Sequence, residues 1–208
     1  MLLSLPQLKA IAALTLLSPF VPLLFQGEEW GARTPFLYFT DHENAELGRR
    51  VAEGRSKEFS SFGWQGAVPN PQEIHTFERS KLNWSELAEP SHAELFEWYR
   101  QLIRLRHEKL NGLSHAAARS TAAARSKAVV RFDAKAEWLR FAHDGVLCVF
   151  NFAATAQRVP IPRGEWQLVL RSDMQEAKPA RDVPPQATFI FRRRAAQRLV
   201  SRLMHRDE

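Results

Sequence analysis

The sequence is nearly free of the residues that mark disulfide, nucleotide and covalent chemistry. It contains a single cysteine, Cys148, among 208 residues, which excludes an internal disulfide. Because Cys148 lies in the apolar run GVLCVFNF, we expect an inert core thiol in a reducing, cytoplasmic compartment. No phosphate-binding glycine loop, dinucleotide fingerprint or serine nucleophile elbow is present. These absences argue against nucleotide-dependent and serine-dependent enzymes.

Metal-binding spacings are missing as well. The segment TDHE at residues 40–43 combines residue types that can bind metals, and His75 and His92 follow it. Their spacing matches no zinc pattern, and a calcium loop needs more acidic residues at alternate positions. We therefore expect neither a metal nor any other cofactor.

The apolar N-terminus, residues 1–25, lacks the features of an export or membrane segment. It has no cationic start, Lys9 lies inside it, and Pro19 and Pro22 would break a helix before it reached the ~20 residues that a bilayer requires. Export or membrane insertion stays open as an alternative, but we expect no membrane partner.

The same segment predicts a helix followed by a strand. Ser4 and Gln7 have the spacing of a capping box, and the helix is expected to end near Leu17. Residues 20–25, FVPLLF, then predict a short strand that is buried on both faces.

The net charge of +6 comes from one end of the chain. Without the C-terminal arginines the chain is close to neutral, so we expect no nucleic-acid partner. Residues 193–208 form a basic tail in which Leu199, Val200 and Leu203 permit an amphipathic helix. The arginines concerned are Arg192, Arg193, Arg194, Arg198, Arg202 and Arg206.

Between residues 27 and 90 the sequence has little periodicity, and its aromatic residues alternate with charged ones. So long an irregular stretch is unusual unless it is functional. A secure helix is predicted next, with Ser91 as N-cap and Glu94 three residues later. Residues 113–126, which are rich in Ala, Arg and Ser, are expected to be a connector.

Beyond the connector, residues 127–192 predict a small antiparallel β-sandwich. The runs 129–132, 137–142, 145–153, 157–162, 165–171 and 187–192 have strand character and are separated by turn residues. Asp144-Gly145 predicts a type I′ hairpin turn, because glycine adopts a positive φ without steric cost. Residues 146–150, VLCVF, are apolar on both faces and should form the central strand.

Read together, these segments resemble the C-terminal part of the α-amylase family of glycoside hydrolases (family 13). A proline and a short apolar run lead into Gly27, Glu28 and Glu29, as in the eighth barrel strand of that family. Within the family, the segments 27–59, 62–86 and 145–173 resemble the branch whose members release trehalose from maltooligosyltrehalose.

The resemblance implies a fold and an incomplete active site. Residues 1–112 would be the last part of a (β/α)8 barrel, with helix, strand 8, long aromatic loop and helix 8, and residues 127–192 the β-domain. The nucleophile Asp, the acid/base Glu and the Asn-His-Asp motif of the family do not occur in these 208 residues, so we expect no catalytic residue here and no activity of the chain alone.

Substrate contact is expected at the loop after the eighth strand, because barrel active sites lie at the carboxyl ends of the strands. Glu28 and Glu29 are neighbours, and on an extended chain only one of them can face a site. The substrate-binding candidates are Glu29, Trp30, Phe36, Tyr38 and Asp41. The partner would be maltooligosyltrehalose or a related α-glucan.

Two alternatives remain open: a non-catalytic glucan-binding or interaction module, and one half of a split enzyme that joins a separately encoded N-terminal barrel half.

Overall fold

The computed structural model describes residues 3–63, 66, 68–117, 128–175 and 182–194. The chain divides into two compact units, residues 1–24 with 94–208 and residues 25–93. The predicted basic tail lies outside the described residues from position 195 onward, and so do positions 118–126 of the predicted connector.

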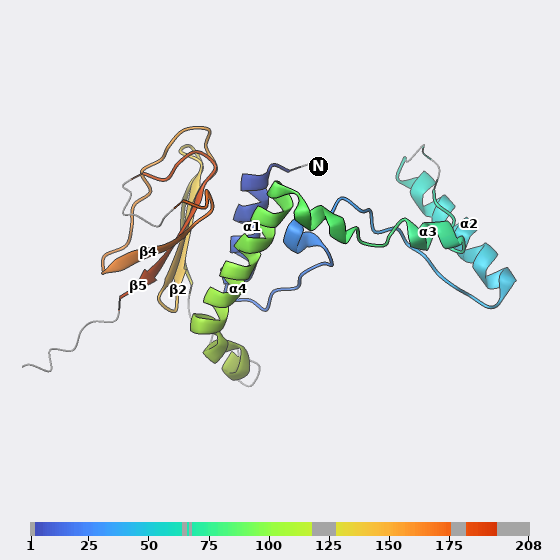
Figure 1. Cartoon of the computed structure of the whole chain (residues 1–208), viewed down its shortest axis with the longest axis horizontal. Coiled ribbons are helices and arrows are strands. Elements are labelled where there is room, and N and C mark those ends of the chain that lie inside the picture. Colours follow the sequence, from blue (N-terminus) through green and yellow to red (C-terminus); the bar gives the residue numbers. More distant parts are fainter. Residues whose placement is uncertain (1–2, 64–65, 67, 118–127, 176–181, 195–208) are drawn as a thin grey trace, which may run out of the picture. The chain divides into compact units, whose positions relative to one another are not determined.

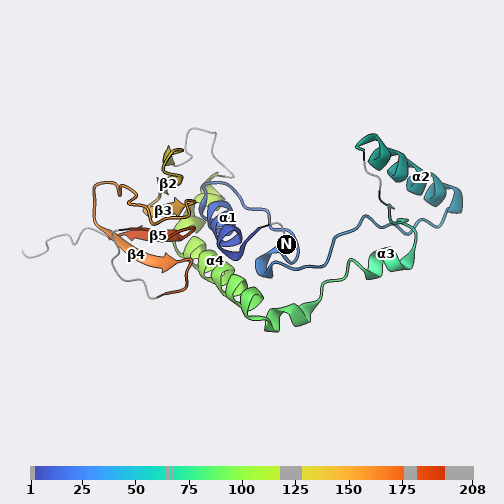
Figure 2. The same ribbon diagram turned by 90° about the horizontal axis from the view of Figure 1, so that it is seen from above.

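The first unit contains a five-stranded antiparallel sheet (Figures 1 and 2). Its spatial order is β1-β2-β3-β5-β4, so the prediction that VLCVF forms the central strand is confirmed. The strands are β1 (Val129–Asp133), β2 (Trp138–His143), β3 (Val146–Asn151), β4 (Trp166–Arg171) and β5 (Thr188–Arg193).

The predicted hairpin turn is confirmed at the β2–β3 connection. Asp144 has φ 47° and Gly145 has φ 76°, the left-handed pair that a type I′ turn requires. The predicted strand at 157–162 is wrong, since only an isolated bridge joins Gln157 to Val183. Pro160 and Pro162 lack the N–H groups that a strand ladder needs.

The β-sandwich prediction is wrong for the described strands, because they all belong to one sheet. Helices provide the second layer on one face: α1 (Leu5–Leu17) and α4 (Pro90–Ala117) lie against the sheet in both views (Figures 1 and 2). One apolar cluster joins the helices to the sheet, with Leu17, Trp98, Leu102, Cys148 and Ile190 among its members. Burial raises the pKa of the Cys148 thiol, in keeping with the predicted inert core position.

Polar contacts fix α1 within this unit. The Nζ of the buried Lys9 lies 2.5 Å from Glu94 Oε1 and 2.5 Å from the carbonyl oxygen of Ser172. The indole N–H of Trp98 donates to the carbonyl of Lys9 at 2.9 Å. At the other end of α1, His143 Nε2 lies 2.5 Å from the Leu17 carbonyl oxygen. The helix is therefore held at Lys9 and at its C-terminal end by groups from α4, from β2 and from Ser172, which follows β4.

The boundaries of the two helices agree in part with the sequence. The predicted helix 5–17 is confirmed, and the Ser4 N–H donates to Gln7 Oε1 at 2.8 Å. The helix α4 begins at Pro90, so Ser91 lies inside it and is not its N-cap. Proline is favoured at the first helical position, where no intrahelical donor is needed. The helix also continues to Ala117, through the start of the predicted connector.

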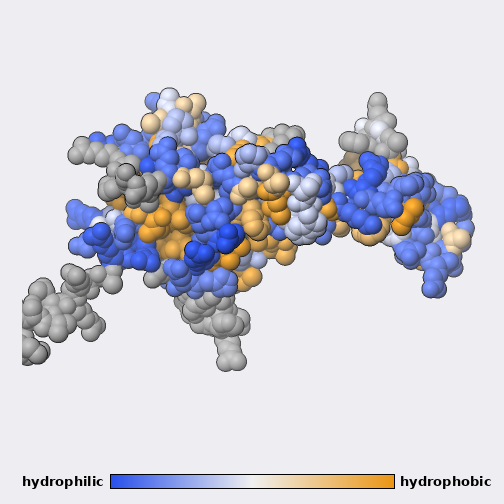
Figure 3. All heavy atoms as spheres, in the orientation of Figure 1, coloured by the Kyte–Doolittle hydropathy of each residue, from blue (hydrophilic) through white to orange (hydrophobic). Residues whose placement is uncertain are grey.

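The strand predicted over residues 20–25 does not form. Phe20, Val21 and Leu23 are 64%, 84% and 91% exposed, and the described residues offer this segment no strand with which to pair. Ile11 and Leu14 on α1 are also about half exposed, and hydrophobic surface is visible over the region of α1 and α4 in Figure 3. The first unit thus combines a closed core with an open apolar face.

The second unit is built from short helices joined by irregular chain. Its elements are η1 (Glu28–Trp30), α2 (Ala45–Ser61), α3 (Ile74–Glu78) and η2 (Trp84–Ala88). The sequence predicted no helix at 45–61. Asn44 caps α2 by accepting from the Leu47 N–H at 3.0 Å, and ion pairs from Glu46 to Arg49 and Arg50 follow. The helix is polar overall, yet Leu47, Val51 and Phe59 recur on it at multiples of four residues, a periodic signal from which the helix could have been predicted.

Among the described helices, no helix has both the length and the apolar character needed to cross a membrane.

Candidate functional site: an aromatic groove beside a tight turn

A tight turn occupies the position of the Gly-Glu-Glu-Trp motif. Gly27 has φ 83° and Gly31 has φ 69°, and the three residues between them form a 3-10 turn. A Cβ on Gly27 would lie 2.7 Å from Ala32 Cβ and 2.8 Å from Leu82 Cδ2. Glycine at position 27 is therefore required both by its left-handed backbone and by the close approach of its neighbours.

The two adjacent acids have different surroundings in this turn. They are not on an extended chain as the sequence suggested, and successive side chains on a 3-10 helix point about 120° apart. Glu28 Oε2 accepts a hydrogen bond from the Phe25 N–H at 2.9 Å. The half-buried Glu29 carboxylate has no hydrogen bond within the described part of the chain. Of the two, Glu29 has the carboxylate that can still bind a ligand hydroxyl.

Trp30 is the anchor of the turn. Its side chain is 1% exposed, and its carbonyl oxygen lies 2.6 Å from Nδ1 of the buried His92. Its ring meets that of Trp84 at 4.9 Å between centroids, while Trp84 itself is 64% exposed. A sugar ring could therefore stack on Trp84, whereas the face of Trp30 is covered.

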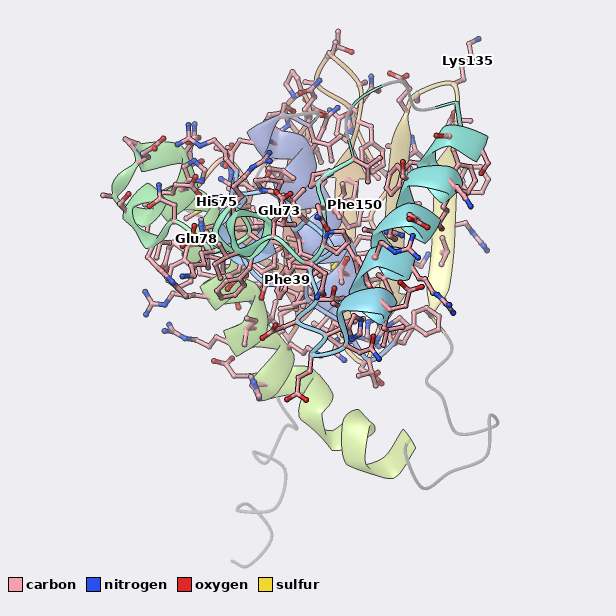
Figure 4. All side chains as sticks on the ribbon, turned by 90° about the vertical axis from the view of Figure 1, so that its right-hand side faces the viewer. Phe39, Glu73, His75, Glu78, Lys135 and Phe150 are labelled. Atoms are coloured by element: carbon pink, nitrogen blue, oxygen red, sulfur yellow. The ribbon has the colours of Figure 1, made fainter. Side chains whose placement is uncertain are left out.

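An aromatic groove of about 440 Å³ lies in the same unit. Phe36 and Phe39 are 6.0 Å apart, and Phe39 and Phe77 are 5.1 Å apart between ring centroids (Phe39 is labelled in Figure 4). Ser80 Oγ accepts from the Leu37 N–H at 3.0 Å and so fixes the segment that carries two of these rings. The remaining lining residues are Gln26, Lys81, Leu82 and Trp84.

The five predicted site residues do not converge on this groove. Phe36 lines it, and Glu29 and Trp30 belong to the 3-10 turn. The Tyr38 ring lies 4.8 Å from the Arg55 guanidinium, on a contact with α2. Asp41 is exposed, and the described residues give its carboxylate no hydrogen bond.

Sequence reasoning did not select Phe39, Phe77, Lys81 and Trp84 as site residues, although three of them belong to the alternating aromatics. The Lys81 Nζ lies 4.7 Å from the Phe77 ring, so an ammonium group borders the aromatic surface. The groove contains no carboxylate among its lining residues, so it offers a stacking surface and a hydrogen-bond donor but no acid and nucleophile pair.

No group of three His, Cys, Asp or Glu side chains suited to a metal ion occurs among the described residues. His75 on α3 lies beside Glu78, with 2.9 Å between Nδ1 and Oε2 (Figure 4). This pair is exposed, and two side chains on one helical turn do not make a metal site.

Comparisons with solved structures define the class of protein. A putative alpha amylase from Salmonella typhimurium aligns over 90% of this chain and 31% of its own, with a TM-score of 0.66 and 29% identity. An alpha-amylase from H. orenii aligns over 92% of this chain and 36% of its own, with a TM-score of 0.50; at 15% identity it supports the fold alone. The chain thus has the fold of the C-terminal part of an α-amylase-like enzyme.

Curated relatives narrow this class. Residues 123–190 match a family model described as a domain of unknown function, DUF3459. The malto-oligosyltrehalose trehalohydrolase of Rhizobium sp. (strain M-11) is 48% identical over 68% of this chain, and that of Brevibacterium helvolum is 44% identical over 82%. The chain is similar to the C-terminal part of the malto-oligosyltrehalose trehalohydrolases, so the predicted resemblance is confirmed. It spans only 23% and 28% of these two relatives.

Proposed function

We propose that this chain is the C-terminal portion of a retaining α-glycosidase that releases trehalose from maltooligosyltrehalose, a step in trehalose formation from α-glucans. The names of the relatives support the reaction class. These 208 residues contain none of the three family segments that carry the nucleophile, the acid/base and the Asn-His-Asp motif. The chain by itself is therefore inactive and depends on a barrel that supplies these groups.

The open apolar face of the first unit carries this proposal. The helix α1 carries apolar residues on its exposed side as well as on its buried side, which is typical of helices that are covered on all sides. Its outer residues Ile11 and Leu14, with Phe20, Val21 and Leu23 beyond its end, remain exposed. The first two relatives have about three quarters of their length outside the match, which is ample to cover this face with barrel strands and helices.

Complementation tests the proposal. The purified chain is mixed with the separately produced segment of a trehalohydrolase relative that precedes the match, and trehalose release from maltooligosyltrehalose is measured. We expect no release from either part alone and release from the mixture. Val21→Asp and Leu23→Asp should reduce the release strongly, while the exposed control Lys135→Ala leaves it unchanged. Turnover by the purified chain alone would refute the proposal.

A non-catalytic glucan-binding module is the second candidate, and the aromatic groove favours it. Exposed aromatic rings beside Lys81 suit stacking against glucosyl rings, which contribute hydroxyls for hydrogen bonds. The stacking contacts would come from Phe36, Phe77 and Trp84. Glu29, in the 3-10 turn that follows Gly27, would accept a hydrogen bond from a sugar hydroxyl. The predicted contacts of Tyr38 and Asp41 remain part of this proposal.

Affinity for maltotetraose separates the two candidates. If the chain is a glucan-binding module, the chain alone should bind maltotetraose saturably, and Phe77→Ala and Trp84→Ala should weaken this binding. Phe62 is an exposed aromatic residue outside the groove, so the control Phe62→Ala should leave the binding intact. A chain that complements a barrel but shows no binding alone is a glycosidase portion and not a module.

A further inference from the structure

A second groove, of about 420 Å³, lies in the first unit between α4 and the β4–β5 side of the sheet. We call it the α4–β4 groove. All its lining residues come from residues 97–108, 169–175 and 192, so it shares none with the aromatic groove.

The groove has an apolar floor and a polar rim. Leu105 is 7% exposed within the core cluster, and Leu170 and Met174 pack against that cluster. The rim residues Gln101 and Gln175 each offer an amide that can both donate and accept. Polar and charged residues outnumber the apolar ones in the lining, so the groove surrounds an apolar floor with many hydrogen-bonding groups, and its volume is in the usual range of small-molecule sites.

The charges of the groove nearly cancel. Arg171 is engaged by Asp173, with hydrogen bonds of 2.9 Å and 2.5 Å. Arg192 lies 4.0 Å from Glu108.

The second lining acid, Glu97, accepts from Arg100 at 2.8 Å. The Arg104 guanidinium has no hydrogen bond or ion pair within the described chain. With three guanidinium groups and two carboxylates the lining offers charged donors as well as charged acceptors, and a neutral ligand with hydroxyl groups can use both kinds at once.

We propose that the α4–β4 groove binds a neutral polyhydroxylated ligand, a short α-linked glucose oligomer or disaccharide. Hydroxyl groups both donate and accept, so they can bond to the Glu108 carboxylate, the glutamine amides and the Arg104 guanidinium at the same time. The apolar floor at Leu170 receives the C–H face of a sugar ring. The site goes beyond the proposed function, and the choice of a glucose-based ligand rests on that function.

Backbone amide shifts in the full-length ¹⁵N-labelled chain test the proposal. Maltotriose and trehalose are titrated separately, which distinguishes a glucan from a trehalose ligand. We expect saturable shifts at residues 101–108 and 169–171 with at least one of the two sugars. Arg104→Ala removes a charged donor and should weaken this binding about tenfold. Because Arg104 is exposed, the variant keeps the fold, and its amide spectrum verifies this.

Two controls separate this site from the aromatic groove. Lys135→Ala and Phe77→Ala should both leave the sugar-induced shifts at 101–108 and 169–171 unchanged. Shifts confined to residues 26–39 and 77–84 would overturn the α4–β4 site while supporting the glucan-binding module. Saturation by inorganic phosphate without a response to either sugar would overturn it in favour of an anion site.

Discussion

The two units of the chain are held together by different kinds of interaction. In residues 1–24 with 94–194, two clusters of buried apolar side chains lie on the two faces of the sheet. In residues 25–93, Trp30 is the only large apolar side chain that the described structure buries, and Phe36, Phe62, Ile74, Phe77 and Trp84 are exposed. Turns, helix caps and ion pairs maintain the second unit. Apolar burial is the dominant stabilising term in folding, so the first unit should be much the more stable.

Limited proteolysis of the chain is the strongest test of this difference. We expect rapid cleavage within residues 31–43, where neither helix nor strand is present, and long survival of fragments with β1–β5 and α4. The sequence predicted residues 127–192 as the β-domain, and the contacts of Lys9 and Trp98 extend the expected protected part to α1. Native mass spectrometry should show α1 bound to the protected fragment. If residues 31–43 were as resistant to cleavage as the first unit, the two units would not differ in stability.

Two matched phenylalanines sharpen the comparison. Phe150 is 1% exposed on the central strand and stacks on Phe141 at 5.8 Å, whereas Phe36 is 55% exposed. Phe150→Ala should lower the free energy of unfolding by about 3–5 kcal/mol. Phe36→Ala should change it by no more than about 0.5 kcal/mol. Urea unfolding followed by circular dichroism measures both, and similar losses would mean that the second unit has a core of its own.

Two glycines of the second unit should respond with opposite sign. Gly27→Ala forces a Cβ against Ala32 and Leu82 at a positive φ, which should cost about 1–3 kcal/mol of local stability. Gly54 lies in α2, and apart from its chain neighbours and the backbone of its own helix no atom lies within 4 Å of the position that an added methyl group would take, so Gly54→Ala should stabilise the helix by about 0.5–1 kcal/mol. Hydrogen exchange at Ala32, whose N–H donates to the Gly27 carbonyl at 2.8 Å, reports the first change, and exchange within 45–61 reports the second.

The elements that the sequence predicted correctly lie mainly in the first unit, and several of those that it missed lie in the second. The strands of the first unit and the Asp144-Gly145 turn follow from local patterns, and they were predicted with small errors at the ends. The failed strand at 20–25 depends on pairing partners, which local sequence does not specify. The helix α2 was missed although Leu47, Val51 and Phe59 recur at multiples of four residues, because charged residues dominate this segment and obscure the pattern.

The aromatic groove shows a related limit. Alternating aromatic residues marked the stretch 30–84 as unusual, but the choice among them depends on the path of the chain. That path is fixed by side-chain bonds between distant residues, such as Thr40 Oγ1 to Gln72 Oε1 at 2.6 Å and the bond from Leu37 to Ser80. Neither pair has a signature in the sequence, so Phe77 and Trp84 could not be placed beside Phe36.

The smallest expected effect concerns the ion pairs of α2. Hydrogen bonds from Arg49 and Arg50 lower the pKa of the Glu46 carboxyl below its ordinary value of 4.5. A carboxyl whose pKa is depressed by folding stabilises the folded state above its unfolded pKa, and this contribution disappears as the pH falls through the folded pKa. Helical circular dichroism should therefore decrease below pH 4.5 in the parent chain, and Glu46→Gln should decrease less over the same range. Because the group is fully exposed, about 0.5 M salt should shrink the difference.

The control Glu43→Gln, at an exposed acid before the helix, should behave like the parent. If the Glu46 variant responded to acid in the same way as the parent, these ion pairs would not stabilise the second unit.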